Sequence, residues 1–381
     1  MNPPAVRVNR KAAGRVASGH PWIFRGDVVD AADAVGGDVV RVIDPSARLL
    51  GTAHYSSSSQ IALRMLSNDT YSARIAAAAA FRRLIVHDSN AFRLVHAEGD
   101  LLPALIIDRY GEYFAVQALD QGMDRALPEI VDALAEQFAP RGILARNDAA
   151  VRTQESLPRE IRVLHGEIPG SIELRMNGLV FFADLRQGQK TGIYLDQREN
   201  YVAAARYGQG RALDCFTSTG GFALHLAAKC EYVEGIDSSA GALATAEQNR
   251  AASSLGNVSF RDADGFDLLA GYASARKTFD IVVLDPPAFA KSRRQIEGAM
   301  RGYREINLRA LRLLGPGGVL VSCSCSHHVS EAALFEAIAR AALDAGKTLR
   351  VLERRTQARD HPILLTVPET HYLKCLILQV I

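Results

Sequence analysis

The sequence predicts an α/β protein whose C-terminal half is a doubly wound, mostly parallel β-sheet. Three observations indicate this fold. From about residue 181 onward, short strands rich in Val, Ile and Leu alternate with helical patterns, which is typical of a parallel sheet with helices on both faces. The first seventy residues instead alternate apolar and polar positions between Gly, Pro and Asp, and the segment between mixes both patterns. Because 381 residues exceed one ordinary core, we expect three domains, at 1–70, 71–180 and 181–381.

The N-terminal domain is expected to be a small β-rich barrel. Residues 39–45 and 61–66 read as strands, and Gly36-Gly37 as a turn. The first 25 residues carry basic side chains and no acidic one: Arg7, Arg10, Lys11, Arg15 and Arg25. Such a run is either a solvated basic face or part of a surface that binds an anionic partner.

The elements of the other two domains follow from the same kinds of pattern. The central segment predicts a compact α+β domain, with a helix at 72–88, a hairpin of strands 105–108 and 113–117, a helix at 124–138 and a strand at 142–145. The strands of the C-terminal sheet are expected at 212–215, 232–237, 258–260, 279–285 and 318–322, with a final strand at 373–381.

Composition excludes several classes of protein. Hydrophobic residues make up 48% and charged residues 23%, the mix of a soluble globular protein rather than a disordered one. No stretch approaches the ~18 uncharged apolar residues of a membrane span, and the N-terminus lacks the apolar core of a signal peptide. The five irregularly spaced cysteines exclude a small disulfide scaffold and favour a reducing compartment, so we expect a cytoplasmic protein. The net charge of +2 argues neither for nor against a nucleic-acid partner.

Acidic side chains follow four of the predicted strands. Asp214, Asp237, Asp264 and Asp285 come at or just after strand ends, where a doubly wound sheet binds its ligands. Each acid alone could instead cap a helix. The loop at 215–221 lacks both the G-x-G-x-x-G pattern of dinucleotide sites and the lysine of a P-loop. A ligand with adenosine and no phosphates fits better, which indicates S-adenosylmethionine.

Several motifs are similar to those of class I methyltransferases. They are Asp214-Cys215-Phe216 with Thr219-Gly220-Gly221-Phe222, Leu284-Asp285-Pro286-Pro287-Ala288-Phe289, and Ser322-Cys323-Ser324-Cys325-Ser326. The chain as a whole resembles the ribosomal RNA large-subunit methyltransferase I family, which makes 5-methylcytosine. The other matching segments are His20-Pro21-Trp22-Ile23-Phe24, Ala97-Glu98-Gly99-Asp100, residues 105–111, residues 192–198, His361-Pro362 and Tyr372-Leu373-Lys374.

This resemblance implies an N-terminal PUA domain, a central α+β domain and a C-terminal Rossmann-like class I methyltransferase domain. It also implies that Asp214, Gly220 and Gly221 hold the methionine part of S-adenosylmethionine. Asp237 would hold the ribose and Asp264 the adenine. The remaining residues implied to line or close the cofactor site are Phe216, Thr219, Asp285, Tyr194 and Arg198.

Methylation of cytosine at C5 calls for a nucleophile from the protein. C5 lies in an aromatic ring and reacts poorly until a thiolate adds to C6, and cysteine is both a strong nucleophile and a good leaving group. The family motif places its single cysteine at Cys325, the predicted nucleophile. Cys215 is expected to face the cofactor. The other cysteines, Cys230, Cys323 and Cys375, are expected to pack inside the fold.

The Asp-Pro-Pro loop is predicted to bind the base. Asp285 would hold N3 or the N4 amino group of cytosine, Pro286 and Pro287 would stiffen the loop, and Phe289 would stack on a flipped base. Many cytosine-5 RNA methyltransferases carry a second cysteine where this chain has Pro287. Release of the product would then need another base.

RNA, with ribosomal RNA first, is the predicted partner, and relatives with PUA domains suggest a homodimer. A basic run follows the Asp-Pro-Pro loop: Lys291, Arg293, Arg294, Arg301, Arg304, Arg309 and Arg312. A solvated helix face explains part of this run, and Lys291, Arg293 and Arg294 are predicted to contact the substrate through its phosphates. Trp22 and Phe24 could stack on bases, but we expect them in the barrel core.

Other functions remain open from sequence alone. The Asp-Pro-Pro-Ala-Phe segment at 285–289 is near the motif of enzymes that methylate amino nitrogens, and these need no cysteine. A non-catalytic RNA-binding or ribosome-assembly module with a vestigial cofactor site is a second alternative. A NAD oxidoreductase is less favoured because the glycine fingerprint is missing. No metal is predicted, because the spacing of Cys323, Cys325, His327 and His328 is too tight for a usual zinc site.

Overall fold

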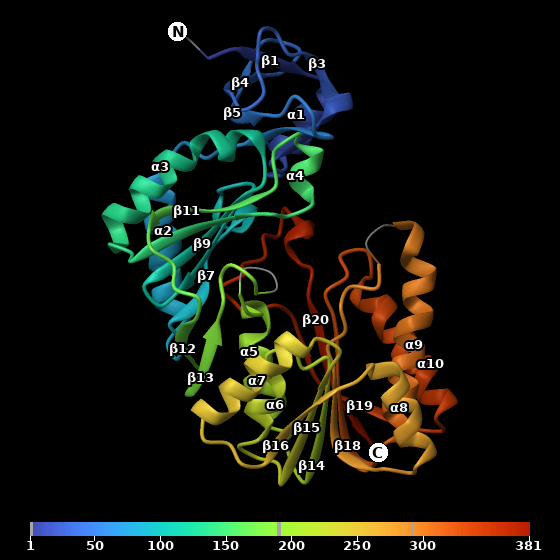
Figure 1. The fold of residues 1–381 in the computed structure, drawn as a ribbon. Helices are drawn as coiled ribbons and strands as arrows, with labels where there is room; N and C mark the ends of the chain where they lie inside the picture. Colours follow the sequence, from blue (N-terminus) through green and yellow to red (C-terminus); the bar gives the residue numbers. More distant parts are fainter. Residues whose placement is uncertain (1–2, 189–191, 291–292) are drawn as a thin grey trace. The chain divides into compact units, whose positions relative to one another are not determined.

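The computed structural model describes residues 3–188, 192–290 and 293–381. The chain packs as two units, and it passes between them more than once (Figure 1). The first unit comprises Met1–Leu174, Ala183–Ile193 and Arg359–Thr370, and the second Arg175–Phe182, Tyr194–Ala358 and His371–Ile381. In the described part of the chain, every helix is too short or too polar to cross a membrane.

A six-stranded sheet forms the N-terminal part of the first unit. Its order is β2-β6-β5-β4-β1-β3. The bounds are β1 Ala5–Val8, β2 Trp22–Phe24, β3 Val28–Asp30, β4 Val39–Ile43, β5 Leu49–Tyr55 and β6 Ile61–Met65. The helix α1 (Arg10–Ala17) begins where the Asn9 side chain accepts a hydrogen bond from the Ala12 N–H. The expected β-rich domain is therefore present.

The expectation that Trp22 and Phe24 fill the barrel core is wrong. Ile23 is the residue of β2 that is fully buried in the core cluster, together with Val6 and Leu63. Side chains alternate across a strand, so the two aromatic neighbours of Ile23 point the other way. Trp22 donates from Nε1 to Glu98 over 2.8 Å, and Phe24 is exposed beneath the Arg15 guanidinium.

A five-stranded sheet forms the central α+β domain. Its order is β11-β10-β9-β8-β7, with bounds β7 Ala91–His96, β8 Leu105–Tyr110, β9 Tyr113–Ala118, β10 Gly142–Asn147 and β11 Glu160–Gly166. The helices α2 (Tyr71–Ile85) and α3 (Gln121–Phe138) start at Thr70 and Asp120, whose side chains accept from backbone N–H groups. Both helices bury apolar residues against this sheet. The short α4 (Val151–Gln154) and the hairpin of β12 (Ile172–Met176) and β13 (Leu179–Ala183) follow.

Charged motif residues of the first unit form a buried network. Arg82 makes two hydrogen bonds to the Asp100 carboxylate and a third to the Asp360 carbonyl oxygen. Asp360 also accepts from the Arg93 N–H over 2.8 Å, and the Arg93 guanidinium pairs with Asp108. One ion network therefore fixes Arg359–Thr370 in this unit. It includes or flanks three segments that the sequence singles out, at 97–100, 105–111 and 361–362.

A seven-stranded sheet forms the second unit and confirms the predicted doubly wound architecture. Its strands are β14 Arg211–Cys215, β15 Tyr232–Asp237, β16 Val258–Asp262, β17 Phe279–Leu284, β18 Leu314–Ser324, β19 Leu349–Arg355 and β20 Lys374–Val380. Their order is β16-β15-β14-β17-β18-β20-β19. The first five run parallel, and β20 pairs antiparallel with both neighbours. The strand order reverses beside β14, which makes the carboxyl ends of β14 and β17 the expected ligand crevice.

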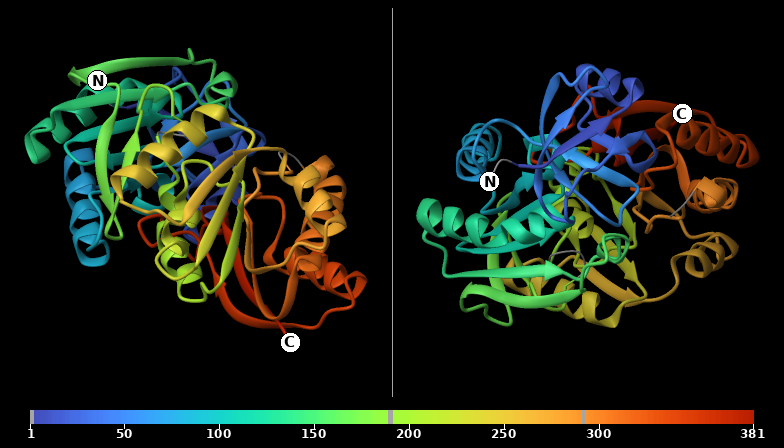
Figure 2. Two further views of the ribbon diagram at one scale, coloured as in Figure 1. Left: turned by 60° about the horizontal axis from the view of Figure 1, so that its bottom comes forward. Right: turned by 90° about the horizontal axis from the view of Figure 1, so that it is seen from above.

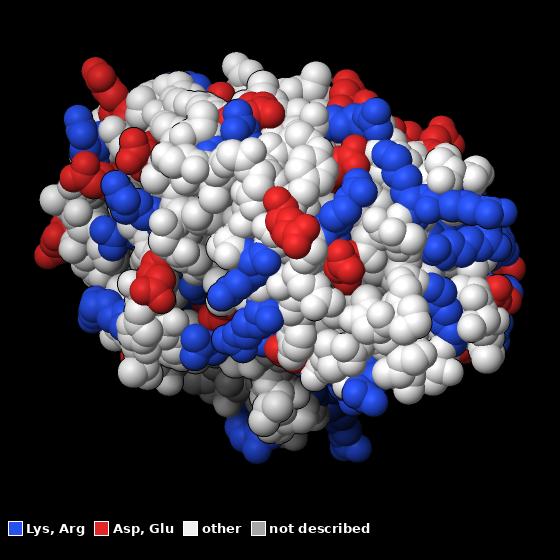
Figure 3. Space-filling model, turned by 90° about the horizontal axis from the view of Figure 1, so that it is seen from below, with Lys and Arg blue, Asp and Glu red and all other residues white. Residues whose placement is uncertain are grey.

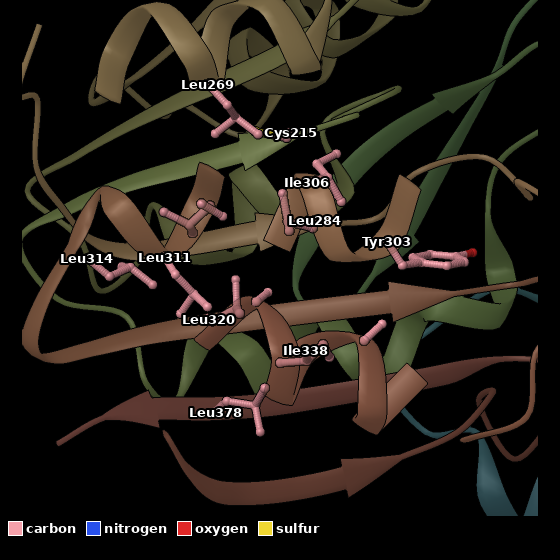
Figure 4. Close-up of a cluster of buried hydrophobic side chains, with 14 of the residues drawn as sticks. Cys215, Leu269, Leu284, Tyr303, Ile306, Leu311, Leu314, Leu320, Ile338 and Leu378 are labelled. Carbon is pink, nitrogen blue, oxygen red and sulfur yellow. The ribbon is translucent and has the colours of Figure 1, made fainter. Parts of the chain in front are cut away.

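Helices cover both faces of this sheet. The helices α5 (Arg198–Ala205), α6 (Gly221–Leu226) and α7 (Ala240–Ala252) lie on one face, and α8 (Gly265–Ser274), α9 (Ile296–Arg312) and α10 (Glu331–Asp344) on the other (Figure 1). In Figure 2, α9 and α10 again lie side by side. The apolar faces of α8, α9 and α10 bury Leu269, Ile306 and Ile338 against Leu284 and Leu320 (Figure 4).

Candidate functional site

The loop after β14 turns sharply at the predicted crevice. Phe216, Ser218 and Gly220 have φ angles of +66°, +51° and +88°, and left-handed backbone is costly for residues other than glycine. The fully buried Asp214 stabilises this turn. Its Oδ2 accepts from the Thr217 hydroxyl over 2.6 Å and from the Ala223 N–H over 3.0 Å. Asp214 therefore ties the loop to the start of α6.

Gly221 is required by packing beneath the loop. A Cβ at this position would lie 2.3 Å from Cζ of Tyr201. The Tyr201 ring lies edge-on to Phe222, with 4.8 Å between the ring centroids. Glycine lets α6 and α5 approach closely here.

The second oxygen of Asp214 is suited to a cationic ligand. Oδ1 is buried and has no hydrogen-bond partner within the described chain. Burial, first of all, and the nearby charges of Asp285 and Asp237 raise the pKa of Asp214 to about 7. A ligand that brings N–H donors and positive charge would stabilise this carboxylate. The ammonium group of S-adenosylmethionine has both properties, so the site fits that cofactor.

The other predicted cofactor residues lie on neighbouring loops. Asp237 ends β15, and its two oxygens accept from the Ser218 and Ser239 N–H groups, each over 2.9 Å. Asp264 is exposed, and its Oδ1 caps α8 by accepting from the Phe266 and Asp267 N–H groups. One oxygen of Asp264 therefore caps a helix, which is the alternative role considered for these acidic residues. Its role toward adenine stays a prediction.

Phe216 and Thr219 complete the loop. The Phe216 ring lies against the start of α8, because a Cβ on Gly265 would be 3.0 Å from it. The Thr219 carbonyl accepts from the Asn249 amide over 2.8 Å. Both residues lie beside the crevice, and their contact with a cofactor stays a prediction.

The segment with Tyr194 and Arg198 is attached firmly to the sheet. Tyr201 donates to the Tyr194 carbonyl over 3.2 Å. Asp196 lies in a short 3-10 helix, Leu195–Gln197, and accepts a hydrogen bond from the Tyr372 hydroxyl over 2.8 Å. Arg198 is buried and lies 3.6 Å from Glu199. These contacts fix the backbone of the segment that carries Tyr194 and Arg198.

Tyr194, Asp285 and Cys325 come together at the ends of β17 and β18. These strands are parallel neighbours with Leu284 opposite Ser322, so Asp285 and Cys325 follow adjacent strand ends. Burial, and then the negative charges of Asp285, Asp196, Cys325 and Asp237, raise the pKa of Tyr194. The charges of both predicted catalytic residues therefore act on the Tyr194 hydroxyl.

Cys325 differs from the other cysteines in its exposure. Cys215, Cys230, Cys323 and Cys375 are buried, and Cys325 is partly exposed. Cys323 and Cys375 lie opposite each other in β18 and β20, and burial raises the pKa of Cys323 well above its usual value. Cys215 does not face the crevice as expected, since it lies in the core between the sheet and α8 (Figure 4). A thiol must be accessible to attack a base, and Cys325 meets that requirement.

The Asp-Pro-Pro loop is partly buried. Pro286 is buried and Pro287 is exposed. The Phe289 ring is half-buried, with centroids 4.7 Å from Tyr303 and 6.0 Å from Phe266. Stacking of Phe289 on a base stays a prediction. Lys291 lies outside the described residues.

The basic run is mostly a solvated helix face. On α9, Arg301 pairs with Glu297, Arg304 with Asp344 and Arg309 with Glu305, each over 2.7 Å. Figure 3 likewise shows basic and acidic side chains interspersed over much of one face, with basic ones gathered at its right edge. Arg293 and Arg294 belong to the short turn before α9, and Arg294 is exposed. Their contact with RNA stays a prediction.

Two residues beside Cys325 carry no role in the sequence analysis. Tyr303, on α9 at the edge of the core cluster (Figure 4), bonds with the Ser326 hydroxyl over 3.1 Å. Lys374, the first residue of β20, donates to the Ser326 carbonyl over 2.7 Å. The sequence offers one indication that Lys374 has a role: it is a charged residue at the start of an otherwise apolar strand. Among the residues that the structure describes, no group of three or more His, Cys, Asp or Glu is arranged to hold a metal.

Known families match both parts of the chain. Residues 6–68 match the model of a PUA-like domain, and residues 149–378 match that of S-adenosylmethionine-dependent methyltransferases. The chain is 40% identical over 377 residues to ribosomal RNA large subunit methyltransferase I of Shewanella amazonensis, covering 95% of each. It is 39% identical to the protein of the same name from Shewanella denitrificans, covering 99% of this chain and 100% of that one.

Solved structures share the fold over the full length. A putative S-adenosylmethionine-dependent methyltransferase from Streptococcus mutans matches with a TM-score of 0.83 at 20% identity, covering 99% of this chain and 100% of that one. A putative methyltransferase complexed with SAH matches with a TM-score of 0.85 at 19% identity and the same coverage.

Proposed function

This chain belongs to the ribosomal RNA large subunit methyltransferase I family, and from that membership we propose that it methylates C5 of a cytosine in RNA. The methyl donor is S-adenosylmethionine. Large-subunit ribosomal RNA is the proposed substrate, since the curated relatives carry that name. The observation that carries the C5 chemistry is the accessible Cys325 beside Asp285.

The crevice at the carboxyl end of β14, between the ends of its neighbours β15 and β17, would hold the cofactor. S-adenosylmethionine supplies a methyl group on a positively charged sulfur. Asp214 offers its buried Oδ1 to the cationic methionine part, while Gly220 and Gly221 let the backbone approach. Asp237, half-buried at the end of β15, is the proposed ribose ligand, and Asp264 the proposed adenine ligand.

Cys325 is the proposed nucleophile. Its thiolate adds to C6 of cytosine, and the electron pair of the C5–C6 double bond moves so that C5 becomes nucleophilic. C5 would then attack the methyl group, and the bond between that methyl group and the positively charged sulfur would break, leaving neutral S-adenosylhomocysteine. Loss of the C5 proton to a base restores the double bond and expels the thiolate, so Cys325 returns unchanged. The partial exposure of Cys325 supports this role.

Asp285 is proposed to orient the base. Asp285 directly follows β17, the parallel neighbour of the strand that leads to Cys325. Its charge also acts on Tyr194. A protonated carboxyl that donates to N3 of cytosine would draw electron density from the ring and favour attack at C6. Pro286, buried, and Pro287 would restrict the loop, and Phe289 would contact the flipped base.

The PUA-like domain is proposed to bind RNA as well. Its exposed Arg7 and Arg10 and the exposed Arg294 of the catalytic unit can contact phosphates. We propose the cytoplasm as its location and a homodimer as its assembly. Light scattering of the purified protein tests the assembly.

Substitution of Cys325 tests the proposal. RNA methylated by the wild type is digested to nucleosides and compared with RNA treated with Cys325→Ala, both with S-adenosylmethionine. The wild type should form 5-methylcytidine and the variant none, while both bind S-adenosylmethionine equally in a calorimeter. A methylated base nitrogen, or full activity of Cys325→Ala, would instead support the amino-methylating chemistry typical of the Asp-Pro-Pro-Ala-Phe motif.

A further inference from the structure

We propose that Lys374 is a positioning residue that holds the loop of Cys325 and stabilises its thiolate. This inference rests on the proposed nucleophilic role of Cys325. It assigns a function to a buried lysine, at the first position of β20, that neither the cofactor nor the base is proposed to touch.

The backbone geometry puts Lys374 beside Cys325. Lys374 pairs in register with Ser324, the residue before Cys325. Its Nζ donates to the carbonyl of Ser326, the residue after Cys325, over 2.7 Å. It also donates to the Tyr372 carbonyl over 2.8 Å. The lysine thus contacts the chain on both sides of the nucleophile.

The burial of Lys374 calls for a counter-charge. Its side chain is 3% exposed, and a buried ammonium group is costly unless an anion compensates it. The two carbonyl partners are neutral. Burial lowers the pKa of Lys374 to about 8, and Cys325 and then Glu331 oppose that shift. A thiolate at Cys325 therefore stabilises the ammonium, and the ammonium stabilises the thiolate.

The other groups around Cys325 do not favour a thiolate. Asp285, Tyr194 and Tyr303 lie in the loop after β17, in the segment before α5 and on α9. Burial first of all, and then negative charges that include Cys325 and Asp285, raise the pKa of both tyrosines. His327 stacks on Tyr372, and burial followed by the charge of Lys374 lowers the pKa of His327, which keeps that ring neutral. Glu331 of α10 pairs with Arg354 of β19 over 2.7 Å, so its negative charge is largely compensated. The negative charges near Cys325 disfavour a thiolate, and the positive charge of Lys374 offsets them.

Alkylation of Cys325 by iodoacetamide, followed by peptide mass as a function of pH, tests the inference. Only thiolates react fast. Lys374→Met should move the midpoint of the Cys325 reactivity curve to higher pH and slow alkylation at pH 7 about 10-fold, the change for about 1.4 kcal/mol. Lys374→Arg, which keeps the charge, should retain most of the wild-type reactivity. The same order should appear in the pH profile of single-turnover methylation.

Lys347→Met is the matched control. Lys347 also donates to a backbone carbonyl, that of Leu314 at the opposite end of β18. This variant should leave the Cys325 curve unchanged. An unchanged curve for Lys374→Met would overturn the inference. If Lys374→Met does not fold, equal slowing by Lys374→Arg and a neutral Lys374→Gln would overturn it as well. Alkylation is independent of methylation, so failure of the proposed function would show separately, as the absence of 5-methylcytidine.

Discussion

Close contacts at single residues determine what the cofactor crevice tolerates. Gly221 is one such residue, because Tyr201 fills the space where a side chain would go. Asp214 is another, because one of its oxygens supports the loop and the other is left for a ligand. Sequence alone identifies both positions from the loop pattern after the first strand. It does not identify Tyr201, since nothing in a helical segment twenty residues earlier indicates which glycine its ring will meet.

Gly221→Ala should weaken both folding and cofactor binding. The added Cβ forces Tyr201 or α6 to move, and overpacking of this kind costs about 1–3 kcal/mol. Urea unfolding and calorimetry with S-adenosylhomocysteine measure the two effects. Gly241→Ala on α7 is the control, because nothing lies within 4 Å of its added Cβ, and it should leave both quantities nearly unchanged or raise stability slightly. Equal behaviour of the two variants would contradict the packing argument.

Asp214 should release a proton when the cofactor binds. Its pKa is raised to about 7 in the free protein, so at pH 6 the carboxyl is mostly protonated, and a cationic ligand would lower that pKa. Folding stability from this group falls as pH rises from about 4 to about 7, because the unfolded chain ionises first. Calorimetry at pH 6 in buffers of different ionisation enthalpy measures the proton. Heats that do not depend on the buffer in the wild type would contradict this prediction, and Asp214→Asn should abolish the dependence.

At the scale of elements, the strands of the parallel sheet overlap the predicted ranges, most clearly β15 and β17, which are short runs rich in Val, Ile and Leu, whereas β18 begins at Leu314 rather than at 318. The elements that lack such a signal include β19 and α1. The strand β19 carries Arg350, Glu353 and Arg354 at the sheet edge, where solvent tolerates charge, and α1 lies within a segment expected to be β-rich. The basic run is a similar case, since only the structure shows which arginines already pair with acids.

Arg294 and Arg301 should therefore differ in RNA binding. Arg294 is exposed on the turn before α9, whereas Arg301 pairs with Glu297 one helical turn away. Arg294→Ala should weaken binding of a ribosomal RNA fragment across sequences and lower the salt slope by about 1. Arg301→Ala should change affinity by less than half as much. Fluorescence anisotropy over a salt series measures both, and a larger loss for Arg301→Ala would contradict the assignment.

At the scale of the whole molecule, the chain inserts residues 359–370 into the first unit before returning to the seven-stranded sheet. Sequence analysis finds the matching segments but not this crossing, because the charged residues that fix it lie far apart in the chain. Arg82 is 1% exposed, and its partners come from positions 100 and 360. The three domain boundaries at 1–70, 71–180 and 181–381 stay predictions.

Arg82→Met should strongly destabilise the first unit. It leaves the buried Asp100 carboxylate without its main partner, which costs about 3–5 kcal/mol. The double variant Arg82→Met with Asp100→Leu should recover much of that loss, since no buried charge remains. Chemical unfolding followed by Trp22 fluorescence, the only tryptophan and a residue of this unit, reports the change. A double variant as unstable as the single one would show that the ion pair is not the source.

Trapping of the covalent intermediate tests the central proposal most directly. RNA that carries 5-fluorocytosine at the target position is mixed with the protein and S-adenosylmethionine, and the products are resolved under denaturing conditions and mapped by mass spectrometry. Fluorine at C5 cannot leave as a proton does, so the thiolate cannot be expelled. The proposed mechanism predicts a stable protein–RNA adduct on Cys325. Methylation of the unmodified RNA with no adduct on the fluorinated RNA, or an adduct on another residue, would contradict it.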